Sequence, residues 1–222
     1  MIAIEDLRFG YANGAFSMEI PALQVTRGQK VAFIGPSGSG KTTLVCLIAG
    51  ILTPRTGSIA VGGTDLARRS DAWRRDFRIS KIGFVFQEFE LLEYLSVRDN
   101  MLLPYYLNAT LELTPQVYRT VEGLAASMDL HEKLKRYPKT LSHGERQRVA
   151  ICRALTTSPD IVIADEPTGN LDPKTAEATL SLLLGEVERR QMTLLMVTHN
   201  YALLDAFDHV VDVQEFTRGN TS

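Results

Sequence analysis

The sequence predicts an α/β fold, with a mostly parallel sheet, an antiparallel β edge at the start and a helical segment inserted in the middle. Three observations lead to this prediction. Apolar runs typical of buried strands alternate with stretches of helical period over residues 29–51 and 160–213. Two strand-like stretches joined by a turn-forming pair precede them. Residues 96–159 carry helical patterns.

Length and composition exclude several classes of protein. The 222 residues are 45% hydrophobic and 23% charged, which is ordinary for a globular chain. The net charge of −2 does not indicate a protein that binds nucleic acid through an overall positive charge, so we expect no nucleic-acid partner. The longest strongly apolar run, Leu44 to Leu52, is well short of the ~20 residues that cross a bilayer, and we expect a cytoplasmic protein.

The first half of the chain reads as strands around one glycine-rich segment. The turn-forming pair Asn13-Gly14 separates two strand-like stretches, which predicts a β-hairpin. Residues 65–80 form a polar segment. The expected elements are strands at residues 2–9, 16–25, 29–34, 58–61 and 81–86 and a helix at residues 41–51.

The second half begins with helices and returns to alternating strands and helices, which indicates parallel β-α-β units. Helices are expected near residues 97–107, 115–128, 144–155 and 173–190, and strands at 160–164, 192–197 and 210–213. We therefore expect a single domain over residues 1–222. Its core spans 1–87 and 160–222, and a helical subdomain spans about 88–159.

The most specific motif lies between a predicted strand and a predicted helix. Its residues are Gly35, Pro36, Ser37, Gly38, Ser39, Gly40, Lys41 and Thr42. They match the pattern of a phosphate-binding loop, in which backbone N–H groups and a helix N-terminus face the anion. Lys41 is then expected to reach the β and γ phosphates and Thr42 to ligate Mg²⁺. We count the next residue, Thr43, among those that bind ATP.

Polar side chains follow three of the predicted strands. Asp165 and Glu166 follow an apolar run, Gln87 follows residues 84–86, and His199 follows residues 194–198. Ligands bind at the carboxyl ends of strands in open α/β sheets, so we expect these side chains at one edge. Asp165 and Gln87 are candidates for holding Mg²⁺, Glu166 for activating water, and His199 for a hydrogen bond to the γ phosphate.

The stretch from Leu141 to Arg148 opens an amphipathic helix. Ser142 with Glu145 three residues later is a capping box, which by itself needs no ligand. Together with the loop and the carboxylates, however, the stretch resembles the signature motif of ABC-type ATPases. Asn170-Leu171-Asp172 matches the D-loop of that family. The resemblance spans nearly the whole chain and implies the ABC ATPase form of the phosphate-loop NTPase fold.

The resemblance implies a role for each matched residue. Tyr11 is the aromatic that stacks on adenine, Gln87 the Q-loop glutamine, Glu166 the catalytic base and His199 the switch histidine. It also implies a head-to-tail homodimer in which ATP held by one copy meets the signature motif of the other. The residues acting in trans are Ser142, His143, Gly144 and Glu145. His143 and Glu145 depart from the usual family pattern, and this puts the rate of hydrolysis in question.

Further matches resemble the subgroup that serves lipoprotein release, macrolide export and bacterial cell division. They lie in residues 87–92, 96–100 and 166–172. The resemblance implies a membrane permease as partner and a peripheral location on the cytoplasmic face of the inner membrane. The apolar stretch from Glu88 to Pro104 is a candidate for docking a helix of that partner, or it packs the helical lobe.

Two other functions remain open on the sequence. One is an ABC ATPase that acts on DNA or ribosomes without a membrane partner, although the chain has no coiled-coil insertion, zinc-ligand cluster or basic arm. The other is a small-molecule kinase with a phosphate-binding loop, which gives no reason for residues 142–147.

Overall fold

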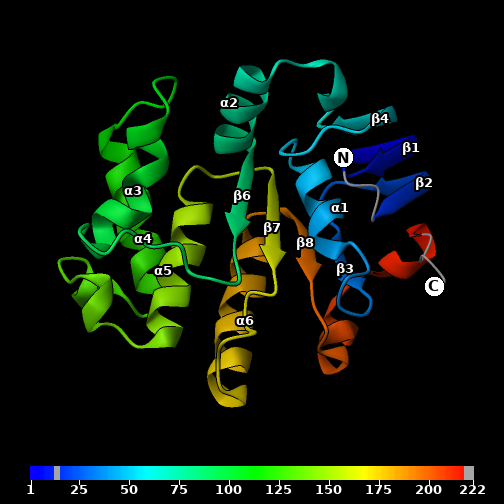
Figure 1. The fold of residues 1–222 in the computed structure, drawn as a ribbon. Coiled ribbons are helices and arrows are strands. Elements are labelled where there is room, and N and C mark those ends of the chain that lie inside the picture. The colour runs from blue at the N-terminus through cyan, green and yellow to red at the C-terminus, as the bar shows by residue number, and fades with distance from the viewer. Residues whose placement is uncertain (13–15, 218–222) are drawn as a thin grey trace. The chain divides into compact units, whose positions relative to one another are not determined.

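The computed structural model describes residues 1–12 and 16–217 (Figure 1). Its contacts divide the chain into two units. The first unit contains Met1–Arg78 and the segment from Thr193 onward, and the second contains Ile79–Met192. The second unit thus contains the expected helical segment together with residues 79–87 and 160–192, which we had expected to belong to the core. The boundaries of a helical subdomain stay a prediction.

An antiparallel sheet in the first unit confirms the expected β edge. Strands β1 (Ile2–Gly10), β2 (Ser17–Val25), β4 (Thr56–Val61) and β5 (Thr64–Asp65) lie in the order β2-β1-β4-β5. In the central strand, Ile4 faces Leu23 on one side and Ile59 on the other. Ile4 and Ile59 are both buried. The turn predicted at Asn13-Gly14 lies outside the described residues.

The glycine-rich segment follows the middle one of three parallel strands in the first unit. Strand β3 (Lys30–Ile34) pairs with β8 (Thr193–Val197) on one side and β9 (His209–Asp212) on the other. Helix α1 (Lys41–Ile48) follows the segment. It ends three residues earlier than expected because Gly50, with φ 66°, takes the left-handed conformation that closes many helices.

Helix α2 (Asp71–Lys81) occupies most of the segment that the sequence analysis read only as polar. None of its residues is buried, although Trp73 and Phe77, one turn apart, stack on each other with 5.1 Å between ring centroids. Arginines attach it instead: Arg74 Nε donates to Gly50 O at 3.0 Å and Arg78 Nη1 to Ala49 O at 3.2 Å. These carbonyls end α1, where cationic side chains are favourable.

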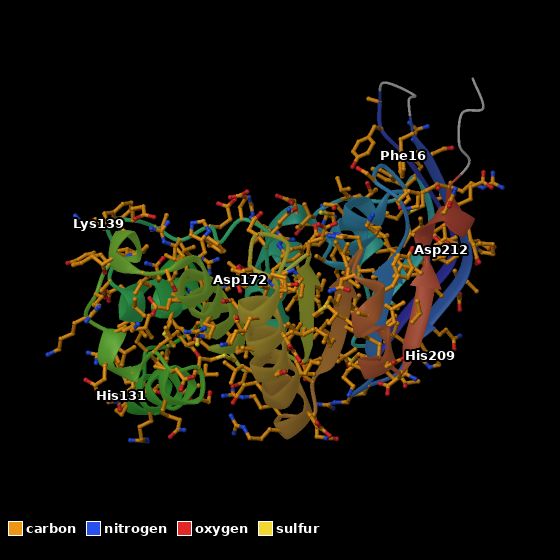
Figure 2. All side chains as sticks on the ribbon, turned by 90° about the horizontal axis from the view of Figure 1, so that it is seen from below. Phe16, His131, Lys139, Asp172, His209 and Asp212 are labelled. Atoms are coloured by element: carbon orange, nitrogen blue, oxygen red, sulfur yellow. The ribbon has the colours of Figure 1, made fainter. Side chains whose placement is uncertain are left out.

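Two parallel strands lie side by side in the second unit, β6 (Ile82–Val85) and β7 (Ile161–Asp165) (Figure 1). Helix α6 (Pro173–Arg189) follows β7. The Asp172 carboxylate, labelled in Figure 2, accepts a hydrogen bond from Thr175 N at 3.1 Å and caps this helix. The expected strands and helix are confirmed within two residues at each end.

The helices of the second unit pack around α5. They are α3 (Val97–Leu107), α4 (Pro115–Ser127) and α5 (His143–Leu155), and α3, α4, α6 and β6 all contact α5. Short 3₁₀ turns complete the chain at Leu66–Arg68, His131–Lys133, Pro138–Thr140, Tyr201–Ala206 and Val213–Phe216. Among the described residues, no helix combines the length and the apolar content that a membrane crossing requires.

Candidate functional site

The glycine-rich segment connects β3 to α1, as the motif requires. A β-carbon on Gly40, which has φ 89°, would lie 2.6 Å from the ring of Phe16, so this position accepts only glycine. Lys41 begins α1, and its ammonium donates to Gly35 O at 2.7 Å and Pro36 O at 2.9 Å. The loop therefore curls around a lysine charge.

The surroundings of the loop favour an anion. No side chain caps the N-terminus of α1, and its first turn contains no acidic residue. The partial positive charge of a helix N-terminus thus adds to the charge of Lys41. Ser39 Oγ is buried, and among the described residues it has no hydrogen-bond partner. A phosphate oxygen would satisfy this hydroxyl, so the residues present fit a bound phosphate.

Tyr11 lies beside the start of α1. Its ring meets Phe9 edge-on at 5.0 Å between centroids, and its hydroxyl is 3.1 Å from Thr43 Oγ1. The residue remains 40% exposed. The structure thus brings two residues that were predicted from distant parts of the sequence to the same helix turn, with aromatic surface still open.

His199 emerges next to the beginning of the loop. Val197 pairs with Phe33 in the parallel ladder, and Thr198 N donates to Phe33 O at 3.1 Å. His199 follows Val197 by two residues, just as Gly35 follows Phe33. The first unit therefore collects Tyr11, the whole loop with Thr42 and Thr43, and His199 around one edge of its parallel strands.

In the second unit, Gln87 and Glu166 lie at the same edge of the parallel strands. Val85 of β6 pairs with Ala164 of β7. Gln87 follows Val85 by two residues, and Glu166 follows Ala164 by two residues. A β-carbon on Gly169 would lie 3.4 Å from Gln87 Nε2 and 3.6 Å from Glu166 Oε2. Both side chains thus lie against the same glycine.

Glu166 has an unusual backbone conformation. Its φ is 46°, in the left-handed region that residues other than glycine rarely adopt and that is enriched at functional sites. Gly169 N donates to Glu166 O at 3.1 Å and closes the turn that holds it. Asn170 Nδ2 donates to Gln87 O at 3.2 Å and joins this turn to the end of β6. The segment after β7 is therefore fastened to the segment after β6.

The signature stretch forms the capping box that its sequence predicts. Ser142 Oγ accepts from Glu145 N at 3.3 Å, and Glu145 Oε2 accepts from Ser142 N at 3.0 Å. Burial by itself would raise the pKa of Glu145, but hydrogen bonds from Lys133 and Ser142 lower it. The two residues that depart from the family pattern thus have contacts here, because Glu145 also forms an ion pair with Lys133 and His143 meets Phe89 edge-on at 5.7 Å.

Gly144 has a packing role. It is buried, and a β-carbon there would lie 2.4 Å from Thr175 Cγ2 at the start of α6. Ser142 and His143, by contrast, are exposed at the N-terminus of α5. The intrasubunit packing therefore explains why position 144 is glycine, and the exposed N-terminus is the part of the motif that is open to a ligand.

Two residues that support the site were missed by the sequence analysis. Arg153 is only 9% exposed, and its guanidinium donates to the carbonyls of Phe89 and Glu90, just beyond Gln87. Asn100 is fully buried, and its amide hydrogen-bonds the backbone of the segment between Leu92 and Ser96. A charged and an amide side chain on the apolar faces of α5 and α3 were the signals that could have revealed them.

Replacing Asn100 by alanine is expected to destabilise the protein by about 2–3 kcal/mol. The change leaves Leu92 N and Leu95 O without their partner, whereas Leu92 O and Ser96 O keep backbone hydrogen bonds from Leu95 N and Asn100 N. Unmade buried hydrogen bonds carry the full cost of desolvation. Urea unfolding measures the free energy. Gln191→Ala, which removes one exposed hydrogen bond, is the matched control. Equal effects of the two changes would contradict the assigned role.

Each unit offers oxygen donors of the kind that Mg²⁺ prefers. In the first unit the Thr42 hydroxyl is exposed in the first turn of α1, and in the second unit the Gln87 amide and the Asp165 carboxylate lie at the ends of strands. Among the described residues there is no group of three or more His, Cys, Asp or Glu side chains that could hold a metal ion. The residues present fit Mg²⁺, which is usually bound through one or two carboxylates together with phosphates rather than by a protein cage.

Comparison with known proteins points the same way. The sequence model of the ABC transporter family matches residues 19–169. The lipoprotein-releasing system ATP-binding protein LolD of Nitrobacter hamburgensis is 38% identical over 218 residues, which are 96% of this chain and 93% of that protein. LolD 1 of Rhodopirellula baltica is 38% identical over 92% of this chain and 90% of its own length.

Solved structures match over the whole chain. A dimeric ATP-binding cassette in a post-hydrolysis state with ADP and Pi has a TM-score of 0.83 at 28% identity, with both chains fully covered. CbiO1 of Clostridium perfringens, part of an ABC transporter complex, has a TM-score of 0.84 at 26% identity and covers 96% of this chain and 85% of its own. The fold, the phosphate-loop geometry and the family match agree: the chain belongs to the ABC transporter family, as an ATP-binding and ATP-hydrolysing subunit.

Proposed function

We propose that the chain binds ATP with Mg²⁺ and hydrolyses it in a head-to-tail homodimer. Each ATP then lies between the phosphate loop of one copy and residues 142–145 of the other. The loop geometry carries this proposal. The Lys41 ammonium, the uncapped N-terminus of α1 and the Ser39 hydroxyl, which has no partner in the described part of the chain, all suit a phosphate chain. The dimeric relative with ADP and Pi supports it.

Each residue of the site has a role in this proposal. Residues 35–43 hold the phosphates, with Lys41 on the β and γ groups, and Tyr11 stacks on adenine. Thr42, Gln87 and Asp165 hold Mg²⁺, which neutralises charge on the phosphate oxygens. Glu166 polarises the attacking water, and His199 donates a hydrogen bond to the γ phosphate. Ser142, His143, Gly144 and Glu145 form the part contributed in trans, with the exposed Ser142 nearest the phosphate.

The work done with ATP is proposed to be lipoprotein release or export. Relatives named for the lipoprotein-releasing system match over nearly their full length and support this proposal. In this proposal, ATP-driven closing of the dimer pushes on a separate membrane permease, and the chain lies on the cytoplasmic face of the inner membrane.

The docking surface for the permease is proposed to lie between Glu88 and Pro104. Tyr94 is 74% exposed, the largest exposure among the large hydrophobic residues of the described chain. It projects from a segment whose backbone the buried Asn100 holds, and Arg153 fixes the residues just before it. An exposed aromatic on a rigid support is a common anchor of protein interfaces.

Tyr94→Asp is expected to weaken binding to the permease by at least about tenfold, because it places a charge at an aromatic anchor. The chain is co-expressed with a candidate permease, and copurification from membranes is measured. Tyr137→Asp changes another exposed tyrosine of the same unit and serves as control. Unchanged copurification with Tyr94→Asp would remove this surface from the proposal. ATPase activity stimulated by DNA or ribosomes, without a permease, would favour the soluble alternative.

A further inference from the structure

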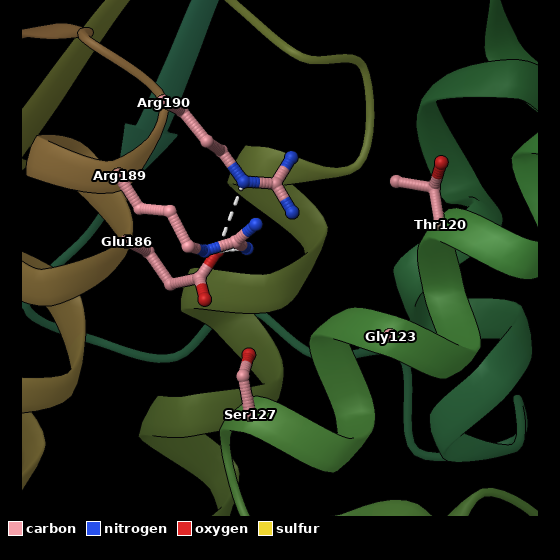
Figure 3. A pocket seen from close by; sticks show the side chains of 6 residues that line it. All are labelled: Thr120, Gly123, Ser127, Glu186, Arg189 and Arg190. Carbon is pink, nitrogen blue, oxygen red and sulfur yellow. Dashed lines mark hydrogen bonds and ion pairs between the residues drawn. The ribbon is translucent and has the colours of Figure 1, made fainter.

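A hollow of about 500 Å³ lies in the second unit beside α4 and α6 (Figure 3). Both helices pack against α5. Helix α4 lines the hollow with Thr120, Gly123 and Ser127, and Glu186, Arg189 and Arg190 line it from the end of α6. Its volume falls within the range of small-molecule sites. None of these residues belongs to the nucleotide site described above.

The charges in the hollow do not cancel. Glu186 accepts from Arg189 Nη2 at 2.5 Å and from Arg190 Nε at 2.9 Å, and its side chain is only 6% exposed. Burial by itself would raise the pKa of Glu186, but hydrogen bonds from the two arginines lower it, so this group is a carboxylate at neutral pH. Two guanidinium groups therefore share one carboxylate, and the cluster has a net positive charge.

Arg190 keeps a free pair of donors. It reaches Glu186 through Nε, and among the described residues Nη1 and Nη2 have no acceptor. Figure 3 shows this end of the guanidinium extending from α6 toward Thr120 of α4. The Arg190 side chain as a whole is 18% exposed. A planar guanidinium with two parallel N–H groups matches the geometry of a phosphate.

Gly123 is exposed where α4 lines the hollow. It lies in the interior of α4, where glycine weakens a helix relative to alanine. A β-carbon added at Gly123 would have no atom within 4 Å, and its backbone does not adopt a positive φ. Neither a close approach nor a special backbone conformation explains the glycine. The open space over Gly123 is instead space that a ligand can occupy.

We propose that this hollow binds a small anion that carries a phosphate group. Arg190 grips the phosphate through Nη1 and Nη2, Arg189 adds charge at the rim, and Gly123 leaves room for the ligand beside α4. Glu186 holds both arginines in place and does not touch the anion.

Binding of inorganic pyrophosphate by isothermal titration calorimetry tests this proposal. All variants are made in a chain that carries Lys41→Ala, because this change disables the phosphate loop. One saturable site is expected, and Arg190→Gln should weaken it by about 10- to 100-fold, the effect of losing charge-assisted hydrogen bonds. Arg119→Gln is the matched control, because Arg119 is exposed on α4, is not among the residues that line the hollow, and hydrogen-bonds Gln116.

Changes at Gly123 separate loss of binding from loss of folding. Gly123→Ala should retain binding, whereas Gly123→Leu should fill the hollow and abolish it. Both changes should leave the melting temperature unchanged or higher, because each replaces a helix-interior glycine. The proposal is overturned if pyrophosphate shows no saturable binding, if Gly123→Leu binds as well as Gly123→Ala, or if Arg119→Gln weakens binding as much as Arg190→Gln.

Discussion

Replacing Glu166 by glutamine is expected to slow ATP hydrolysis by about 10²- to 10⁴-fold, the usual contribution of a general base. The amide has nearly the same shape as the carboxylate but cannot accept the proton of the attacking water. Glu166 lies at the carboxyl end of β7, against the same glycine as Gln87, and its left-handed backbone is held by the turn to Gly169. ATP binding should survive, because the loop of residues 35–43 is unchanged.

Phosphate release at steady state measures the rate, and calorimetry with ATP measures binding. Glu177→Gln is the matched control, since Glu177 is an exposed carboxylate on α6. Because ATP is bound and not consumed, the homodimer should also persist in size-exclusion chromatography. Turnover equal to that of the control would take the role of base away from Glu166.

Ser142→Arg is expected to reduce hydrolysis by at least about 10²-fold, the scale for losing a donor to charge that develops in the transition state. Ser142 is exposed at the N-terminus of α5, and an arginine there would block the approach of the second copy to the γ phosphate. ATP binding to the monomer should remain, because its own loop and Tyr11 are intact. Phosphate release and calorimetry again separate the two effects.

The change also removes a helix cap, which costs about 1 kcal/mol by itself. Ser96→Ala controls for this loss, since Ser96 Oγ accepts from Asp99 N at 3.1 Å in the same way at the start of α3. A mixing experiment gives the sharper test. Mixed dimers of Ser142→Arg with Lys41→Ala regain one site in which both halves are intact, so activity should return on mixing. If the mixture of the two variants hydrolyses no more ATP than either variant alone, the composite site is contradicted.

Most elements of the fold follow from local patterns. The glycine loop, the capping box at Ser142 and the strands that end before Gln87 and Glu166 are each encoded within about ten contiguous residues. Helix α2 was missed for a related reason: it buries none of its residues and is held by Arg74 and Arg78 on the carbonyls that end α1. The helical spacing of Trp73 and Phe77, among many charged residues, was the signal that could have predicted it.

The candidate site also has a part that the sequence predicted and a part that only the structure revealed. The sequence predicted the phosphate loop, and the structure supplied the register that sets His199 beside the loop and Gln87 beside Glu166. It also showed that Gly144 packs against Thr175 and that Arg153 holds the segment after Gln87. These contacts join residues more than thirty positions apart, so no pattern within a short window contains them.

The sequence by itself therefore determined that this chain binds nucleoside triphosphate, because the residues of a phosphate loop are contiguous and their spacing is the mechanism. Only the tertiary structure decided which side chains support that chemistry and where a second anion can bind. The hollow beside Arg190 is lined by residues of α4 and α6, two helices that both pack on α5. Burial and charge between distant segments arise when the chain folds, and for this reason the sequence alone gave no sign of that hollow.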